Sequence, residues 1–257
     1  MRCAFSSERR SVLGSSDFFA SPVRVVFGIS TAPFRIGFTG GFPALARLAY
    51  PCSPLINRPG AGYHGGMVAT MDELLHALTR AVNALSESDV RFAVAGGCAV
   101  YARGGPASDH DVDLFVKPED ASRAVQVLTR AGLRGCDPAE DWLKKVYDRD
   151  TLIDIIYRPN CRDVTDELLD RAETMRIGPA VAPVVSATDL MVDKLLVFDA
   201  HRLDLSPLLH IARDLREQVD WPQVRAETIH SPYAKAFLGL IDDLGIADTR
   251  ADMKKAG

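Results

Sequence analysis

The chain has 257 residues, of which 47% are hydrophobic and 25% charged, and its formal net charge is −4 at pH 7. This composition is typical of a soluble globular protein with one large domain or two modest ones. The charge argues against a broadly basic surface that coats nucleic acid, and no apolar run reaches the roughly 18 residues of a membrane span. The five cysteines are scattered and odd in number, a pattern that favours a cytoplasmic protein over a disulfide framework.

The first 66 residues show no sustained helical or strand periodicity. They are rich in Gly, Pro, Ser and Arg, with seven arginines, no lysine and two acidic residues. The short apolar run "VRVVFGI" contains Arg24, which argues against a secretory signal. We predict that residues 1–66 are a poorly ordered or non-native extension and that folding begins near Met67 or Met71.

From Met71 onward, helical and strand patterns alternate along the chain. Apolar residues at helical spacing predict a helix over 71–88, and "VRFAVA" predicts a short strand. A compact helix in "GGCAVYARG" precedes a strand in "VDLFV", and Pro118 opens the next helix. The segments "WLKKVY" and "TLIDIIY", separated by the turn "DRD", predict an antiparallel hairpin.

The last third of the chain is mainly helical in pattern. Before it, "DELLDRAETM" predicts a short helix and "AVAPVVS" a final strand or an extended lead-in, with Pro183 favouring the edge of the sheet. Ser186 is a helix cap, and three dipeptides open further helices: Ser206-Pro207, Trp221-Pro222 and Ser231-Pro232. We therefore predict a core domain over residues 67–185 and a helical domain over 186–257.

Asp111 and Asp113 stand at the start of the predicted strand "VDLFV". In an extended chain their carboxylates point to one face, while the valines and leucine between and after them point to the other. Repulsion between the two carboxylates would raise the pKa of one of them unless a cation holds both. Carboxylate oxygens suit Mg²⁺ or Mn²⁺, so the sequence predicts a metal site at these two residues.

Asp154 is a third acidic candidate, flanked by leucine and isoleucine in the strand "TLIDIIY". An ionised carboxylate in so apolar a strand is costly unless it is paired or bound to a metal. If this strand lies beside "VDLFV", Asp154 would complete a three-carboxylate site. Such a site could hold one or two ions and organise an in-line attack on phosphorus.

Gly96 and Gly97 supply the complementary half of this arrangement. Glycines let backbone N–H groups approach an anion closely, and a helix that begins there offers its positive end to phosphate. A phosphate-cradling turn shortly before a pair of metal-binding acids is what nucleoside-triphosphate chemistry needs.

Two other interpretations of the acidic stretch stay open. A solvated acidic loop would carry the same residues without a ligand. A calcium loop would place Asp109, Asp111 and Asp113 at alternate positions, although Leu114 stands where that loop needs glycine and Asp120 replaces its last glutamate.

The run "AVAGGCAVYARGGPASDHDVDLFV" resembles the signature of the polymerase-beta-type nucleotidyltransferase superfamily. The matching positions are Gly96, Gly97, Asp111 and Asp113, with Asp154 at the place of the third acid. The resemblance implies an α+β fold: a mixed sheet with flanking helices, followed by a helical C-terminal domain. It also implies Mg²⁺ or Mn²⁺ as cofactor and transfer of a nucleoside monophosphate from a nucleoside triphosphate to an acceptor hydroxyl.

The stretch over residues 184–215 is similar to the helical part of abortive-infection-type members, which include toxins of toxin–antitoxin pairs. There a lysine and a later aspartate contribute to the site, which match Lys194 and either Asp204 or Asp214. This likeness implies RNA, particularly a tRNA 3′ end, or a protein hydroxyl as the acceptor, with small molecules such as aminoglycosides as an alternative. It also implies an antitoxin protein as a partner.

The resemblance also assigns roles around the acids. The basic and hydroxyl residues that often precede the Asp pair are represented here by Arg103 and Ser108, the candidates for further nucleotide contacts. Asp154 would be a metal ligand and the general base for the acceptor oxygen, or the residue that positions it, and Lys194 would neutralise phosphate charge. The alternative function is a catalytically silent nucleotide- or RNA-binding module with the same fold.

Overall fold

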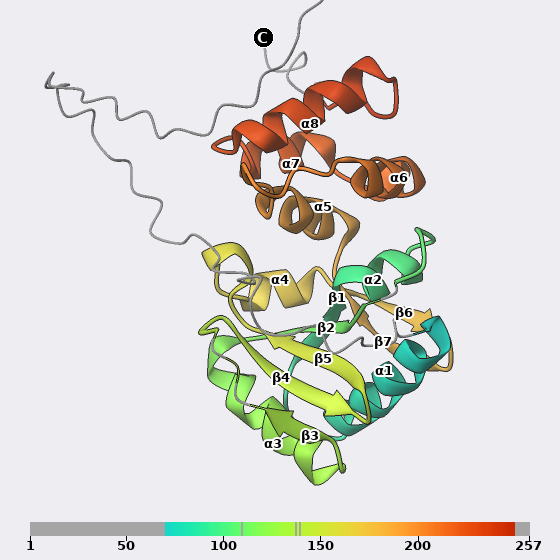
Figure 1. Cartoon of the computed structure of the whole chain (residues 1–257), viewed down its shortest axis with the longest axis vertical. Helices are drawn as coiled ribbons and strands as arrows, with labels where there is room; N and C mark the ends of the chain where they lie inside the picture. The colour runs from blue at the N-terminus through green and yellow to red at the C-terminus, as the bar shows by residue number, and fades with distance from the viewer. Residues whose placement is uncertain (1–69, 109, 137, 139, 250–257) are drawn as a thin grey trace, which may run out of the picture. The chain divides into compact units, whose positions relative to one another are not determined.

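The structure is a computed structural model, and it describes residues 70–108, 110–136, 138 and 140–249 (Figure 1). The predicted extension over residues 1–66, Met67 and Asp109 lie outside the described residues. Among the helices of the described part, none is long and apolar enough to cross a membrane.

One mixed sheet carries the described α/β part of the chain. Its strand order is β3-β4-β5-β2-β1-β7-β6, in which β2 pairs in parallel with β5 and β1 in parallel with β7. The remaining neighbours are antiparallel. The strands are β1 Phe92–Ala95, β2 Val112–Val116, β3 Arg134–Cys136, β4 Leu143–Asp148, β5 Thr151–Ile156, β6 Glu173–Ile177 and β7 Ala180–Val184.

Two helices, α1 (Met71–Ser86) and α3 (Ala121–Arg130), contact each other and the sheet (Figure 1). Thr70 begins α1 with a capping box, in which its hydroxyl accepts from the Glu73 amide at 3.3 Å while the Glu73 carboxylate accepts from the Thr70 amide at 2.8 Å. Of the apolar residues that predicted this helix, Leu74, Leu78, Val82 and Leu85 are buried in the core, and Leu75 is half-buried. Each such burial contributes about 1.5–3 kcal/mol, which explains why this helix follows its sequence pattern.

Shorter elements connect the strands. The bounds are α2 Gly96–Ala102, η1 Pro118–Asp120, η2 Pro159–Cys161 and α4 Asp166–Asp170. Helix α2 contacts β1, β2 and β6. It begins with the glycine pair, immediately after the last residue of β1.

From residue 187 onward the described chain is helical. The elements are α5 Ala187–Leu196, α6 Ser206–Leu215, η3 Arg216–Gln218, α7 Trp221–Glu227 and α8 Pro232–Asp243. Ser186 caps α5 as predicted, since its hydroxyl accepts from the Asp189 amide at 3.0 Å. A mixed sheet with flanking helices and C-terminal helices confirms the predicted α+β fold class. The domain boundary at residue 186 stays a prediction.

Two sequence predictions near the end of the sheet are wrong. The helix expected over 166–175 ends at Asp170, and residues 173–177 form β6 instead. A two-residue turn, in which Gly178 has a φ of +55°, joins β6 to β7 and closes an antiparallel hairpin. Strand pairing across this turn outweighs the helical pattern of the sequence.

Strand β7 is not at the edge of the sheet, because β1 lies on one side of it and β6 on the other. Pro183 is accommodated because β7 pairs with β1 only briefly, at Val94 and Val184. The Val185 amide donates to the Val94 carbonyl at 2.9 Å. Alternate residues of a strand direct their N–H groups to the same side, so the nitrogen of Pro183 faces β1, as the Val185 amide does. The short pairing with β1 stops at this point, so proline, which has no N–H group to donate, is tolerated there.

Candidate functional site

Strand pairing brings the three predicted acids together. Strand β5 lies beside β2 in parallel, and Asp113 and Asp154 are direct neighbours in the register. Asp111 immediately precedes β2. One carboxylate oxygen from each of Asp111, Asp113 and Asp154 lies within 4.8 Å of the others. The strand neighbourhood that a three-carboxylate site requires is therefore present.

The glycine pair fits closely against this cluster. Gly96 has a φ of +54°, and a Cβ atom there would lie 1.6 Å from Asp113 Oδ2. A Cβ atom on Gly97 would lie 2.2 Å from the hydroxyl oxygen of Ser108. Only glycine fits at both positions, so the structure brings Gly96 beside Asp113 and Gly97 beside Ser108.

The electrostatics of the acids favour a bound cation. Burial, followed by the charges of Asp111 and Asp154, holds the pKa of Asp113 well above its usual range. Burial also raises the pKa of Asp154 to about 6, although the nearby Lys145 ammonium opposes this shift. Asp154 Oδ1 is buried and accepts no hydrogen bond from a described residue. Three clustered carboxylates with an unsatisfied buried oxygen fit the oxygen-ligand preference of Mg²⁺ or Mn²⁺.

Cys98 lies in the same region, on α2, and its side chain is buried. Burial, with the charges of Asp113 and Asp111, raises the pKa of the Cys98 thiol to about 12. It therefore stays protonated at neutral pH and packs as a small apolar side chain, which excludes it as a nucleophile.

Lys194 lies on α5 within electrostatic range of the cluster, since its charge lowers the pKa of Asp113. Its neighbour Asp193 was not predicted. Burial raises the pKa of Asp193 to about 6, while Lys194, Arg162 and Asn160 oppose the shift. The Asn160 side-chain amide donates both to the Asp193 carboxylate and, at 3.1 Å, to the Asp193 carbonyl. These bonds tie the segment after β5 to the helix that carries Lys194.

Arg103 is buried at the end of α2, and its guanidinium donates to groups of the protein. Nε donates to the Val185 carbonyl at 2.8 Å, and Nη2 donates to Glu173 at 3.0 Å and to the Val184 carbonyl at 3.4 Å. Nη1 donates to Gln218 at 3.3 Å, and the Gln218 amide donates back to the Arg103 carbonyl at 2.9 Å. These bonds show that Arg103 joins α2 to β7 and η3, and its role in nucleotide binding stays a prediction.

The two alternative later acids are both exposed. Asp204 Oδ1 accepts from the Ser206 amide at 3.0 Å, so it stabilises the start of α6. Asp214 lies on the exposed side of α6. No described contact brings either residue to the acidic cluster.

Lys145 is the second residue near the cluster that the sequence did not single out. It is the direct cross-strand neighbour of Asp154, and its Nζ lies 3.7 Å from Asp154 Oδ1. The pattern of the predicted hairpin contained the necessary signal, because pairing outward from the turn sets Lys145 opposite Asp154 once the turn length is known.

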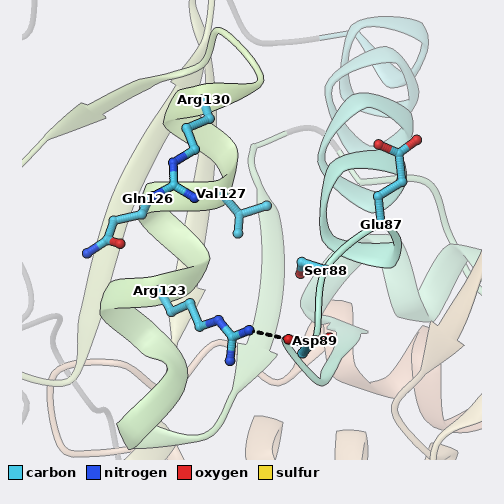
Figure 2. A pocket seen from close by; sticks show the side chains of 7 residues that line it. All are labelled: Glu87, Ser88, Asp89, Arg123, Gln126, Val127 and Arg130. Carbon is cyan, nitrogen blue, oxygen red and sulfur yellow. Dashed lines mark hydrogen bonds and ion pairs between the residues drawn. The ribbon is translucent and has the colours of Figure 1, made fainter.

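A separate hollow of about 450 Å³ lies between the segment after α1 and the helix α3 (Figure 2). Its wall includes Arg123 and Asp89, which form an ion pair at 2.6 Å. No member of the acidic cluster lines this hollow. The ion pair lies at an exposed surface, so the hollow offers no counterpart to the chemistry of the acids.

Comparison with solved structures supports the fold assignment. The solution structure of the antibiotic-resistance factor ANT(2″)-Ia matches with 15% identity and a TM-score of 0.50, covering 65% of this chain and 96% of that chain. The lincosamide antibiotic adenylyltransferase LnuA, with lincomycin bound, matches with 15% identity and a TM-score of 0.41, covering 59% of this chain and 99% of that chain. At these identities the first likeness shows the fold alone, and the second is too distant to add to it. No curated protein matches the chain.

The family comparison is more specific. A family model described as "Uncharacterised nucleotidyltransferase" matches residues 64–241, which include the glycine pair, the three acids and most of the C-terminal helices. This match covers well over half of the 257 residues. The chain therefore belongs to this nucleotidyltransferase family, within the polymerase-beta-type superfamily, and is a nucleotidyltransferase.

Proposed function

We propose that the protein transfers a nucleoside monophosphate from a nucleoside triphosphate to an acceptor hydroxyl in a metal-dependent reaction. The observation that carries the proposal is the gathering of Asp111, Asp113 and Asp154 within 4.8 Å, against a glycine turn that leaves no room for side chains. A purely structural acidic cluster would not need an unsatisfied buried oxygen at its third member.

Asp111, Asp113 and Asp154 are the residues that would hold Mg²⁺ or Mn²⁺. A divalent cation bound there would neutralise the charge of the triphosphate and of the transition state. The backbone at Gly96 and Gly97 would receive the phosphates, with the Ser108 hydroxyl beside Gly97 as a further donor. Lys194, whose charge already acts on Asp113, would offset negative charge on the phosphates.

Asp154 would be the general base. In the metal-free protein its pKa of about 6 leaves the carboxylate ionised at neutral pH, the form that can bind a cation and accept the proton of an approaching hydroxyl. The hydroxyl oxygen would form a bond to the α-phosphorus as the bond to the bridging oxygen breaks. The nucleoside monophosphate then remains on the acceptor, pyrophosphate leaves, and Asp154 holds the proton.

For the acceptor we propose an RNA 3′ end, such as that of a tRNA, or a hydroxyl of a protein, which would make the chain the toxin of a toxin–antitoxin pair. The likeness of residues 184–215 to abortive-infection-type members supports this choice. A small-molecule hydroxyl is the second candidate, because the neighbour that shares the fold at a TM-score of 0.50 is an antibiotic-resistance factor.

The test is transfer of label from each of the four α-labelled nucleoside triphosphates with Mg²⁺ or Mn²⁺. Total RNA, a protein extract and a panel of aminoglycosides are supplied in separate reactions. We expect label in the RNA or the protein fraction, lost in Asp111→Asn. Label only in the aminoglycosides would support the second candidate. Nucleotide binding without transfer to any acceptor would favour a catalytically silent binding module.

A further inference from the structure

The register of the sheet places a lysine in line with the acidic cluster. Lys145 in β4 opposes Asp154 in β5, which opposes Asp113 in β2, which in turn opposes Ala95 at the end of β1. Directly opposed residues on neighbouring strands project to the same face of a sheet. Lys145 therefore shares the face of the two acids, and Asp154 separates it from Asp113 and from the glycine turn that follows Ala95.

Lys145 and Asp154 lie close together without forming a hydrogen bond. Lys145 Nζ lies 3.7 Å from Asp154 Oδ1, which is beyond hydrogen-bonding distance, and the two side chains are 23% and 10% exposed. This Oδ1 is the buried oxygen that accepts no hydrogen bond from a described residue. In the described part of the chain, Lys145 is also the basic side chain that forms an ion pair with Asp154.

We infer that Lys145 is a positioning residue for Asp154, which it attracts from the β4 side while Asp111 and Asp113 repel it from the β2 side. The inference rests on the proposed function, in which Asp154 is both a metal ligand and the general base. The ammonium also offsets part of the negative charge of three clustered carboxylates. In the register, Asp154 stands between Lys145 and the glycine turn.

This role has a signature that a merely structural lysine lacks. The ammonium and a divalent cation act on the same carboxylate, and charges of the same sign repel each other. Removing the ammonium should therefore tighten metal binding, although it weakens the hold on Asp154 that the reaction requires. A general loss of structure would weaken metal binding and catalysis together.

The chain supplies a matched control. Lys144, the preceding residue, opposes Ile155 in the register and therefore projects to the other face of the sheet. Lys144→Met removes the same charge from the same strand without approaching Asp154. Lys145→Arg keeps the charge at position 145, and Lys145→Gln serves as a second neutral variant if Lys145→Met does not fold.

The experiment measures the Mn²⁺ dissociation constant of the full chain without nucleotide, by calorimetry, together with kcat and the KM for the triphosphate. We expect Lys145→Met to bind Mn²⁺ roughly three- to tenfold more tightly. We expect its kcat at saturating metal to fall at least tenfold, with an unchanged KM. Lys145→Arg should restore both values to near those of the unaltered protein, and Lys144→Met should change neither.

Unchanged or weaker Mn²⁺ binding in both neutral variants, or a kcat that stays at the level of Lys144→Met, would overturn the inference. Asp113→Asn, measured alongside, identifies failure of the proposed function itself. If that variant binds Mn²⁺ and transfers nucleotide as well as the unaltered protein, the metal site is misassigned. If it loses both while Lys145→Met changes neither, the site stands and only the role of Lys145 is refuted.

Discussion

Asp154 lies in an apolar strand, has a carboxylate oxygen that accepts no hydrogen bond from a described residue, and has the Lys145 ammonium 3.7 Å away. Without a metal, its ionised form is poorly stabilised by the protein, which is what burial and a pKa of about 6 express. This unfavourable burial of a carboxylate occurs at the residue that the proposed reaction needs as a base and as a metal ligand. The same reasoning explains why Asp113, beside it in the register, also has a raised pKa.

This cost predicts a pH-dependent gain of stability in Asp154→Asn. The pKa of Asp154 is raised from 3.8 to about 6 in the folded protein, so the folded state binds the proton more tightly than the unfolded state. The contribution of this group to stability therefore falls as pH rises from about 4 to 6, and the full cost is present above pH 6. We expect metal-free Asp154→Asn to be about 2–3 kcal/mol more stable than the unaltered protein at pH 7.5 and no more stable at pH 4.

Urea unfolding in EDTA at the two pH values measures this difference. A variant that is less stable at pH 7.5 would show that the protein satisfies the ionised Asp154 without a metal. The nucleotidyl transfer activity of the same variant should be lost.

Gly96 gives a second prediction at the scale of a residue. In Gly96→Ala the new Cβ would meet Asp113 Oδ2 at 1.6 Å, and the φ of +54° adds backbone strain. Gly104→Ala is the matched control, because its φ of +90° carries strain while no atom lies within 4 Å of the new Cβ. We expect Gly104→Ala to lose about 1–2 kcal/mol of unfolding free energy.

Gly96→Ala should lose clearly more unfolding free energy than Gly104→Ala, together with transfer activity. Both are measured by urea unfolding and by label transfer. Equal losses in the two variants would mean that the contact with Asp113 is not what requires glycine at position 96.

At the scale of elements, Arg103 connects α2, β7 and η3 through its buried guanidinium. We expect Arg103→Ala to lose about 3 kcal/mol of unfolding free energy, because buried acceptors then lose their donors. The control is Arg123→Ala, whose exposed ion pair with Asp89 contributes at most about 1 kcal/mol. Thermal or urea unfolding compares the two. A loss in Arg103→Ala no larger than in Arg123→Ala would contradict this structural role.

The helices were predictable from the sequence because their signals are local. The capping residue Ser186 and the Ser-Pro and Trp-Pro openings act within one turn. Strands β3 and β6 were missed, and the position of β7 was wrong, because strand partners are set by contacts distant in the sequence.

Some residues of the candidate site could likewise be predicted from the sequence, whereas others depend on strand pairing. Asp111, Asp113, Asp154 and the glycine pair stand out because carboxylates in apolar strands and adjacent glycines are unusual in themselves. The role of Lys145 depends on register: Asp148 belongs to β4 and pairs with Thr151, so the turn is one residue shorter than "DRD". A shift of one residue would have moved Lys145 to the opposite face.

At the scale of the whole molecule, the first described helix is capped by residues of the described part of the chain. The capping box of α1 uses only Thr70 and Glu73. We therefore expect a chain that starts at Met67 to keep the unfolding free energy and the transfer rate of the full chain. Urea unfolding and label transfer measure both quantities. A clear fall in either would show that residues 1–66 contribute to the fold or to the site.

The most direct test of the central claim is the metal dependence of label transfer in matched variants of the full chain. The account predicts transfer that requires Mg²⁺ or Mn²⁺, releases one pyrophosphate for each nucleotide incorporated, and falls at least about a hundredfold in Asp111→Asn and in Asp113→Asn. Asp214→Asn, an exposed acid on α6, should retain the rate. Transfer that continues in EDTA, or that survives in Asp111→Asn and Asp113→Asn, would contradict a metal-dependent nucleotidyltransferase site at these carboxylates.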